Sequence, residues 1–122
     1  MQYKYLFFGK VVRGKNRGKD LGFPTANIAL HKNIPEGIYL SHVSFDKKQY
    51  PALTFIGSAK TFGETDKKAE VYFLNLNKNL YGNRITIRII KKIRGNEKFE
   101  SEKELIIQME KDRENALKYF EI

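Results

Sequence analysis

Cysteine is absent from this 122-residue chain, which excludes disulfide bonds and thiolate metal sites. A cytoplasmic location is the default expectation for such a chain. Long apolar runs are also missing: no segment approaches the length of a membrane span, and the lysine-containing start lacks the apolar core of a signal peptide. The chain has no low-complexity tract and no internal repeat. We therefore predict one globular domain, residues 1–122, with a single core and no membrane partner.

Acidic residues are the minority charge, with 14 Asp and Glu against 23 Lys and Arg, for a net charge of +9. This excess suits a nucleic-acid backbone, a polyphosphate such as ATP, or a lysine-rich solvated surface. The cations are scattered from Lys4 to Lys118, which favours the solvated surface. A nucleic-acid-binding barrel remains the alternative, although it requires exposed aromatic residues between cations. Tyr39, Tyr72 and Phe73 occur among apolar residues and are predicted to pack in the core, so nucleic acid is not an expected partner.

Short apolar segments bounded by turn signals make up the first three-quarters of the chain. These segments predict strands at Tyr3–Val12, Ile38–Phe45, Tyr50–Ile56, Glu70–Leu76 and Arg84–Ile93. No helical pattern separates them, which is typical of an antiparallel barrel or sandwich. Of the two we predict a mainly β fold built on a small antiparallel Greek-key barrel of about six strands.

The last part of the chain has a helical pattern. Ser101-x-x-Glu104 forms a capping box, in which the Ser101 hydroxyl accepts from the Glu104 N–H while the Glu104 side chain reaches back. An apolar stripe follows at helical spacing, formed by Leu105, Met109, Ala116 and Phe120. We expect one C-terminal helix packed against the barrel. The polar loop from Gly57 to Ala69 is long for a compact domain and is typical of a functional flap.

The segment from residue 14 to residue 27 combines glycines, cations and small oxygen-bearing side chains. Glycines let backbone N–H groups approach an anion, and Lys15 and Lys19 add positive charge. Thr25 and Asn27 are two positions apart, so in an extended segment both side chains point to the same side. Two neutral oxygens on one side suit a Mg²⁺ ion that takes its other ligands from phosphate and water. The segment therefore predicts a phosphate site beside a metal site.

The spacing in this segment excludes the commoner phosphate loops. Only three residues separate Gly14 from Gly18, and Asp20 follows Lys19, whereas a Walker A loop has four residues there and Ser or Thr after its lysine. No Gly-x-Gly-x-x-Gly dinucleotide motif occurs. The plain structural alternative is a glycine-rich hairpin loop followed by an X-Pro turn.

The pattern Gly14-x-x-x-Gly18-Lys19-x-x-Gly22-Phe23-Pro24-Thr25-Ala26-Asn27 resembles the signature of riboflavin kinases. The resemblance continues to the final helix and covers nearly the whole chain. It implies Mg-dependent transfer of the ATP γ-phosphoryl group to the ribityl 5′-hydroxyl of riboflavin, giving FMN and ADP. It also implies that Thr25 and Asn27 bind Mg²⁺, and that the nucleotide is held by Gly14, Lys15, Gly18, Lys19, Gly22, Pro24, Thr25 and Asn27.

The resemblance also assigns a catalytic residue and a flavin site. Riboflavin kinases have a catalytic glutamate at the head of a strand followed by a Tyr-Gly pair, and Glu70 matches it, which makes Glu70 the expected general base. The isolated His31 and His42 are rival bases that we expect to be structural or solvated. The run around residues 93–101 resembles the segment that closes over the flavin and implies flavin contacts from Arg94, Glu97 and Phe99.

Three positions depart from the family pattern. Ala59-Lys60 lies where an Arg-Pro pair is common, and Asn96 replaces an acid. Lys19 replaces an arginine, which keeps the charge but loses the bidentate fork. A domain that binds flavin without catalysis is a further alternative. The chain looks like the C-terminal kinase domain of bacterial bifunctional riboflavin kinase/FAD synthetases. It lacks a His-x-Gly-His motif, so we expect it to stop at FMN, with an FMN adenylyltransferase domain as partner if it is an excised domain.

Overall fold

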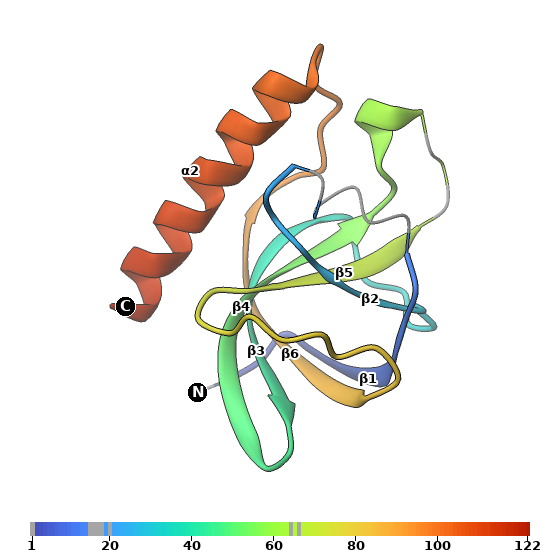
Figure 1. The fold of residues 1–122 in the computed structure, drawn as a ribbon, viewed down its shortest axis with the longest axis vertical. Coiled ribbons are helices and arrows are strands. Elements are labelled where there is room, and N and C mark those ends of the chain that lie inside the picture. Colours follow the sequence, from blue (N-terminus) through green and yellow to red (C-terminus); the bar gives the residue numbers. More distant parts are fainter. Residues whose placement is uncertain (1, 15–18, 20, 64, 66) are drawn as a thin grey trace.

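A closed antiparallel barrel forms the body of the molecule in the computed structural model, which describes residues 2–14, 19, 21–63, 65 and 67–122 (Figure 1). Within these residues, neighbouring strands pair in the order β1-β2-β5-β4-β3-β6. The strands are β1 (Tyr5–Val12), β2 (Ala26–Ile28), β3 (Gly37–Phe45), β4 (Lys48–Gly57), β5 (Lys68–Phe73) and β6 (Arg84–Arg94). A short 3₁₀ helix, η1 (Lys60–Phe62), follows β4. The predicted mainly β barrel is confirmed.

Alternation along the strands separates the inside of the barrel from its outside. On β5, Ala69, Val71 and Phe73 are buried in the barrel core, while the residues between them are half-buried on the outer face. The other strands contribute fully buried side chains to the same core, among them Ile28, Tyr39, Val43, Ile56, Ile85, Ile87 and Ile89. The barrel interior is therefore a packed core, and a substrate site has to lie outside it.

Helix α2 (Glu102–Phe120) lies along the outside of the barrel (Figure 1). A second apolar cluster joins α2 to the strands, with Ile38, Leu40, Leu53 and Ile90 from the barrel and Ala116 from the helix. Part of the barrel wall is thus buried on both faces, which predicts a strong contribution to stability from these strands.

The capping box at the start of α2 is confirmed in part. The Ser101 hydroxyl accepts from the Glu104 N–H at 3.2 Å, as predicted. The Glu104 carboxylate, however, accepts from the N–H of Glu100 at 3.1 Å, one residue earlier than the motif predicts. Both contacts satisfy backbone donors at the start of the helix.

Strand β2 is the element that the sequence pattern did not predict. It has three residues, Ala26–Ile28, and so is too short to show alternation. The other strands differ from their predicted bounds by up to three residues, the largest shift being at the end of β5, which stops at Phe73. In the part of the chain that the structure describes, no helix is both long and apolar enough to cross a membrane.

Candidate active site

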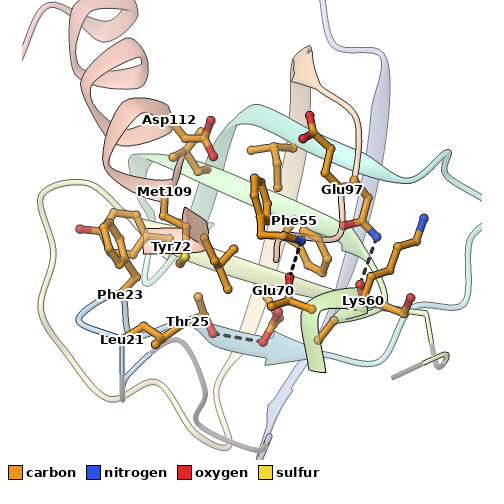
Figure 2. A pocket seen from close by; sticks show the side chains of 18 of the residues that line it. Leu21, Phe23, Thr25, Phe55, Lys60, Glu70, Tyr72, Glu97, Met109 and Asp112 are labelled. Atoms are coloured by element: carbon orange, nitrogen blue, oxygen red, sulfur yellow. Dashed lines mark hydrogen bonds between the residues drawn. The ribbon is translucent and has the colours of Figure 1, made fainter. Parts of the chain in front are cut away.

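A pocket lies on the outside of the barrel, where β4, β5, η1 and α2 meet. Its lining includes five residues that the sequence analysis assigned to the site: Thr25, Glu70, Arg94, Glu97 and Phe99. They come from three separate stretches of the chain. Figure 2 shows Thr25 and Glu70 joined by a hydrogen bond, with Phe23, Tyr72 and Met109 together at one end of the view. The fold therefore brings the predicted catalytic and flavin-binding residues to one cavity.

Glu70 faces this pocket because of its position in the β5 alternation. It is paired with Asn27 on β2 and with Phe55 on β4, so all three side chains lie on the outer face. The Thr25 hydroxyl donates to Glu70 Oε1 at 3.4 Å, and Lys68 Nζ lies 3.9 Å from the same oxygen. The carboxylate is only about one-fifth exposed. It is thus a proton acceptor held beside an apolar cavity, which suits a general base.

Asn27 carries a buried oxygen that suits a cation. The residue is 8% exposed, and its Oδ1 atom has no hydrogen-bond partner among the described residues. Buried polar atoms without partners are rare in folded proteins and call for an explanation. An amide oxygen with a hydroxyl oxygen nearby is the kind of donor set that Mg²⁺ accepts. The residues present therefore fit the predicted Mg²⁺ site at Thr25 and Asn27, and the binding itself stays a prediction.

Gly14 packs against the side chain of Asn27. A Cβ atom at this position would lie 2.3 Å from Asn27 Nδ2 and 2.6 Å from Asn27 Oδ1, so no larger residue fits without displacing the amide. The start of the predicted phosphate segment thus touches the predicted metal ligand. This contact gives the glycine a specific reason to be there.

Of the other predicted nucleotide-binding residues, the described Lys19, Gly22 and Pro24 do not line this pocket. Lys19, Gly22 and Pro24 are exposed, and Gly22 has a positive φ of 91°. Lys15 and Gly18 lie outside the described residues. The roles of these residues in binding phosphate therefore remain predictions.

Arg94, the last residue of β6, is held by a carboxylate of helix α2. Its Nε atom donates to both carboxylate oxygens of Asp112 at 2.9 and 3.0 Å, and its Nη2 atom lies 2.8 Å from Oδ2. Gln108 Nε2 donates to the same carboxylate at 3.0 Å. Asp112 is 4% exposed, so this is a buried, hydrogen-bonded pair. Arg94 fixes the helix to the barrel next to the pocket, and its predicted contact with flavin is untested.

Several aromatic residues that line the pocket were not predicted from the sequence to do so. Tyr72 was expected in the core, yet it lies on the outer face of β5 and lines the cavity with Phe55. Its ring lies 5.5 Å from that of Phe23, and the Arg113 guanidinium lies 5.1 Å from the Phe23 ring. Counting in steps of two from Glu70 would have placed Tyr72 on the same face as the predicted base.

Part of the predicted flap lines the pocket. Residues 58–62, which contain η1, contribute to its wall, and Lys60 is among them. Figure 2 shows Lys60 and Glu97 at the end of the view away from Phe23. That this segment moves as a flap remains a prediction.

Asn96, which stands where an acid was expected, has an acidic partner. Its Nδ2 atom donates to Glu36 Oε1 at 3.1 Å and to the Ser58 carbonyl at 3.0 Å. The hydrogen bond from Asn96 is the largest effect that lowers the pKa of Glu36 below its ordinary value, with smaller ones from the Ser58 N–H and from Lys60 and Lys67. An acid at position 96 would repel this carboxylate.

Comparison with known proteins agrees with this geometry. The sequence profile of the family described as "Riboflavin kinase" matches residues 1–120. The chain belongs to the riboflavin kinase family. The family identified from the residue 14–27 signature is thus confirmed.

Proteins that are similar to this chain are longer than it. A bifunctional riboflavin kinase/FMN adenylyltransferase from Bacillus subtilis (strain 168) is 36% identical over 122 residues, which is 95% of this chain and 39% of the relative. A riboflavin kinase structure from Trypanosoma brucei has a TM-score of 0.64 at 26% identity, covering 95% of this chain and 79% of that one. A structure titled macrolide-efflux protein, from Streptococcus pneumoniae, has a TM-score of 0.79 at 31% identity, covering 91% and 38%. The chain spans well under half the length of the curated relatives it matches.

Proposed function

We propose that this chain transfers the γ-phosphoryl group of ATP to the ribityl 5′-hydroxyl of riboflavin, giving FMN and ADP. The observation that carries the proposal is the position of Glu70, which lies in an apolar pocket beside Thr25 and opposite Asn27. A proton acceptor, a pair of neutral oxygens for a cation and an apolar acceptor site are what such a transfer needs.

Glu70 is the proposed general base. The 5′-hydroxyl of riboflavin would lie within hydrogen-bond distance of the carboxylate, which orients the nucleophilic oxygen and accepts its proton as the bond to phosphorus forms. The Thr25 hydroxyl, 3.4 Å from Oε1, helps to fix the carboxylate. Phosphoryl transfer asks little covalent chemistry of the protein, so positioning and charge neutralisation supply most of the rate enhancement.

The nucleotide half of the site is proposed to lie around β2. Asn27 Oδ1 and Thr25 Oγ1 would hold Mg²⁺, which when bound neutralises charge on the ATP phosphates. The predicted phosphate segment, with Gly14, Lys19 and Gly22 in the described part of the chain, leads directly into this strand. Its glycines bring backbone N–H groups close to the phosphates, and its lysines add positive charge.

The flavin half is proposed to lie along the outer wall of β4 and β5. Phe55, Tyr72 and Phe99 give aromatic surface to a cavity whose lining is largely apolar. The planar flavin ring is well matched to such aromatic walls. A flavin enclosed by them would also exclude water, which would otherwise accept the phosphoryl group. Arg94 and Glu97 are the polar groups placed to hydrogen-bond the flavin edge.

One incubation tests the proposal. The protein is mixed with riboflavin, ATP and Mg²⁺, and FMN is measured by chromatography, with Glu70→Gln as the matched inactive variant. We expect FMN from the wild type and at least about 100-fold less from the variant. No FMN from the wild type across several divalent metals and nucleotides would contradict the proposal. It would leave a flavin-binding domain without catalysis if riboflavin still bound.

A partner domain follows from this proposal. FMN adenylyltransferase activity is named in the Bacillus subtilis relative, and we propose an FMN adenylyltransferase domain as the partner that uses the product FMN. The chain alone, incubated with FMN and ATP, is expected to give no FAD. The cytoplasmic location remains a prediction from the cysteine-free sequence.

A further inference from the structure

Two irregular segments form one wall of the pocket. The first is residues 58–62, which follow β4 and contain η1, and the second is residues 95–99, which follow β6. Asn96 and Ser58, which are hydrogen-bonded across the two segments, are 38 positions apart in the sequence. The shape of this wall depends on what fixes the two segments to each other.

Two hydrogen bonds join the segments directly. Asn96 Nδ2 donates to the Ser58 carbonyl at 3.0 Å, and the Phe99 N–H donates to the Thr61 hydroxyl at 3.1 Å. Phe99 is one of the aromatic residues that line the cavity. The position of its ring is therefore coupled to the position of the η1 segment.

Glu36 contacts both segments at the place where they meet, which we call the junction. Its Oε1 atom accepts from Asn96 Nδ2 at 3.1 Å and from the Ser58 N–H at 3.4 Å. A Cβ atom at Gly57 would lie 2.7 Å from Glu36 Oε1 and 2.9 Å from Asn96 Nδ2, and Gly57 has a φ of 147°. The two side chains thus pack directly on backbone that needs glycine. Glu36 itself is not among the residues that line the pocket, so we expect it to affect substrate through its contacts with Asn96 and Ser58, which do line it.

We propose that Glu36 and Asn96 are a positioning pair, which holds the two loop segments at the separation that the flavin ring requires and so sets the affinity for riboflavin. The proposal rests on the proposed function, because it assumes that the flavin occupies this wall of the pocket. It gives neither residue a part in the phosphoryl transfer, since Glu70 and Asn27 lie on β5 and β2.

The charges around the pair explain why an amide suits position 96. The pKa of Glu36 is lowered chiefly by the Asn96 hydrogen bond, and the positive charges of Lys60 and Lys67 lower it further. A carboxylate in place of Asn96 would put two like charges at hydrogen-bond distance, with Glu97 adjacent in the chain. Asn96→Asp is therefore expected to loosen the junction at pH 8 and to recover in part as the pH is lowered and the two carboxyls come to share a proton.

The kinetic test uses Glu36→Ala, Asn96→Ala and the double variant, with exposed Asn115→Ala and Glu110→Gln on α2 as controls. Each single variant is expected to raise the KM for riboflavin about tenfold, with kcat and the KM for ATP changed less than about twofold. The double variant is expected to be no worse than the more affected single variant by more than about twofold, because both remove one junction. If Glu36→Ala does not fold, Glu36→Gln keeps an acceptor and is expected to raise that KM about threefold.

A second readout needs no catalysis. Amide hydrogen exchange of residues 58–62 and 95–99 in the ligand-free protein is expected to be about tenfold faster in Asn96→Ala and unchanged in Asn115→Ala. Unchanged exchange together with an unchanged KM for riboflavin would contradict the proposal that Glu36 and Asn96 position this wall. Additive increases in that KM in the double variant would contradict it as well. If the wild type makes no FMN, the proposed function fails. In that case exchange and a riboflavin fluorescence titration still decide whether the pair positions the wall.

Discussion

Glu70 and Asn27 face each other directly across the β2–β5 strand pair. Paired residues of antiparallel strands have Cβ atoms about 5 Å apart and project to the same face of the sheet. A single register therefore fixes the distance between the proposed proton acceptor and the proposed cation ligand. A slip of one residue would turn one of the two side chains into the barrel core.

Replacing Glu70 tests the first of these roles. Glu70→Gln keeps the shape of the side chain but removes the proton acceptor, so we expect turnover to fall at least about 100-fold. ATP affinity, measured by calorimetry, is expected to change less than about threefold. A variant that keeps near-wild-type turnover would exclude Glu70 as the base.

Replacing Asn27 tests the second role. Asn27→Ala removes an oxygen that has no hydrogen-bond partner among the described residues, so the loss of stability is expected to be small, within about 1 kcal/mol. The affinity for ATP in the presence of Mg²⁺ is expected to fall about tenfold or more, and its dependence on Mg²⁺ to shift to higher concentration. Asn79→Ala is the matched control, because the Asn79 Oδ1 atom already accepts from the Tyr81 N–H at 2.9 Å. Equal Mg²⁺ dependence in the two variants would contradict the metal site.

Breaking the Arg94–Asp112 pair is expected to affect both stability and flavin binding. Asp112→Asn leaves a guanidinium that is only 15% exposed without its counter-charge, which costs about 3 kcal/mol in the free energy of unfolding. Urea denaturation measures this loss, with Glu110→Gln on the exposed side of the same helix as control. The KM for riboflavin is expected to rise more than the KM for ATP, because Arg94 and Asp112 line the pocket. A loss no larger than that of the control would show that the pair contributes little.

His42 is expected to make the stability of the fold depend on pH. Burial, with a smaller effect of the nearby Arg88, lowers the pKa of His42 below its ordinary value of 6.5. The unfolded chain therefore takes up a proton at higher pH than the folded protein does. The free energy of unfolding is thus expected to fall as the pH drops through about 6.5 towards the lower folded pKa.

The variant His42→Gln isolates this effect. Urea unfolding at several pH values between 5.5 and 8 is expected to show a smaller loss with falling pH than in the wild type. The difference between the two proteins at pH 8 measures only lost packing and the lost hydrogen bond between Tyr3 and His42, which is 2.9 Å long. Parallel pH curves for the two proteins would contradict the role of His42.

Local patterns were sufficient to predict most of the fold. Five strands and the C-terminal helix follow from alternation and from the Ser101 cap. Strand β2 escaped because three residues cannot show a period, and its pairing with β1 and β5 is what makes it a strand. Tyr72 was misplaced because an apolar strand residue looks the same whether it faces the core or a pocket.

Long-range partners could not be predicted at all. The sequence showed that Asn96 replaced an acid, but not that Glu36, 60 positions away, would accept its hydrogen bond. The bond between Arg94 and Asp112 likewise depends on how α2 lies against the barrel. Such pairs arise from the closure of the fold, which no local pattern records.

The position of the pocket on the outer wall has a consequence for how this protein can be altered. On β5, Val71 and Phe73 belong to the barrel core, whereas Glu70 and Tyr72 belong to the pocket. Adjacent residues of β5 thus differ in their surroundings, because one set packs in the barrel core and the other lines the pocket. A mutant library restricted to pocket-lining positions that lie outside the second apolar cluster, such as Lys60 and Glu97, should therefore be able to explore new acceptor alcohols while both cores stay intact.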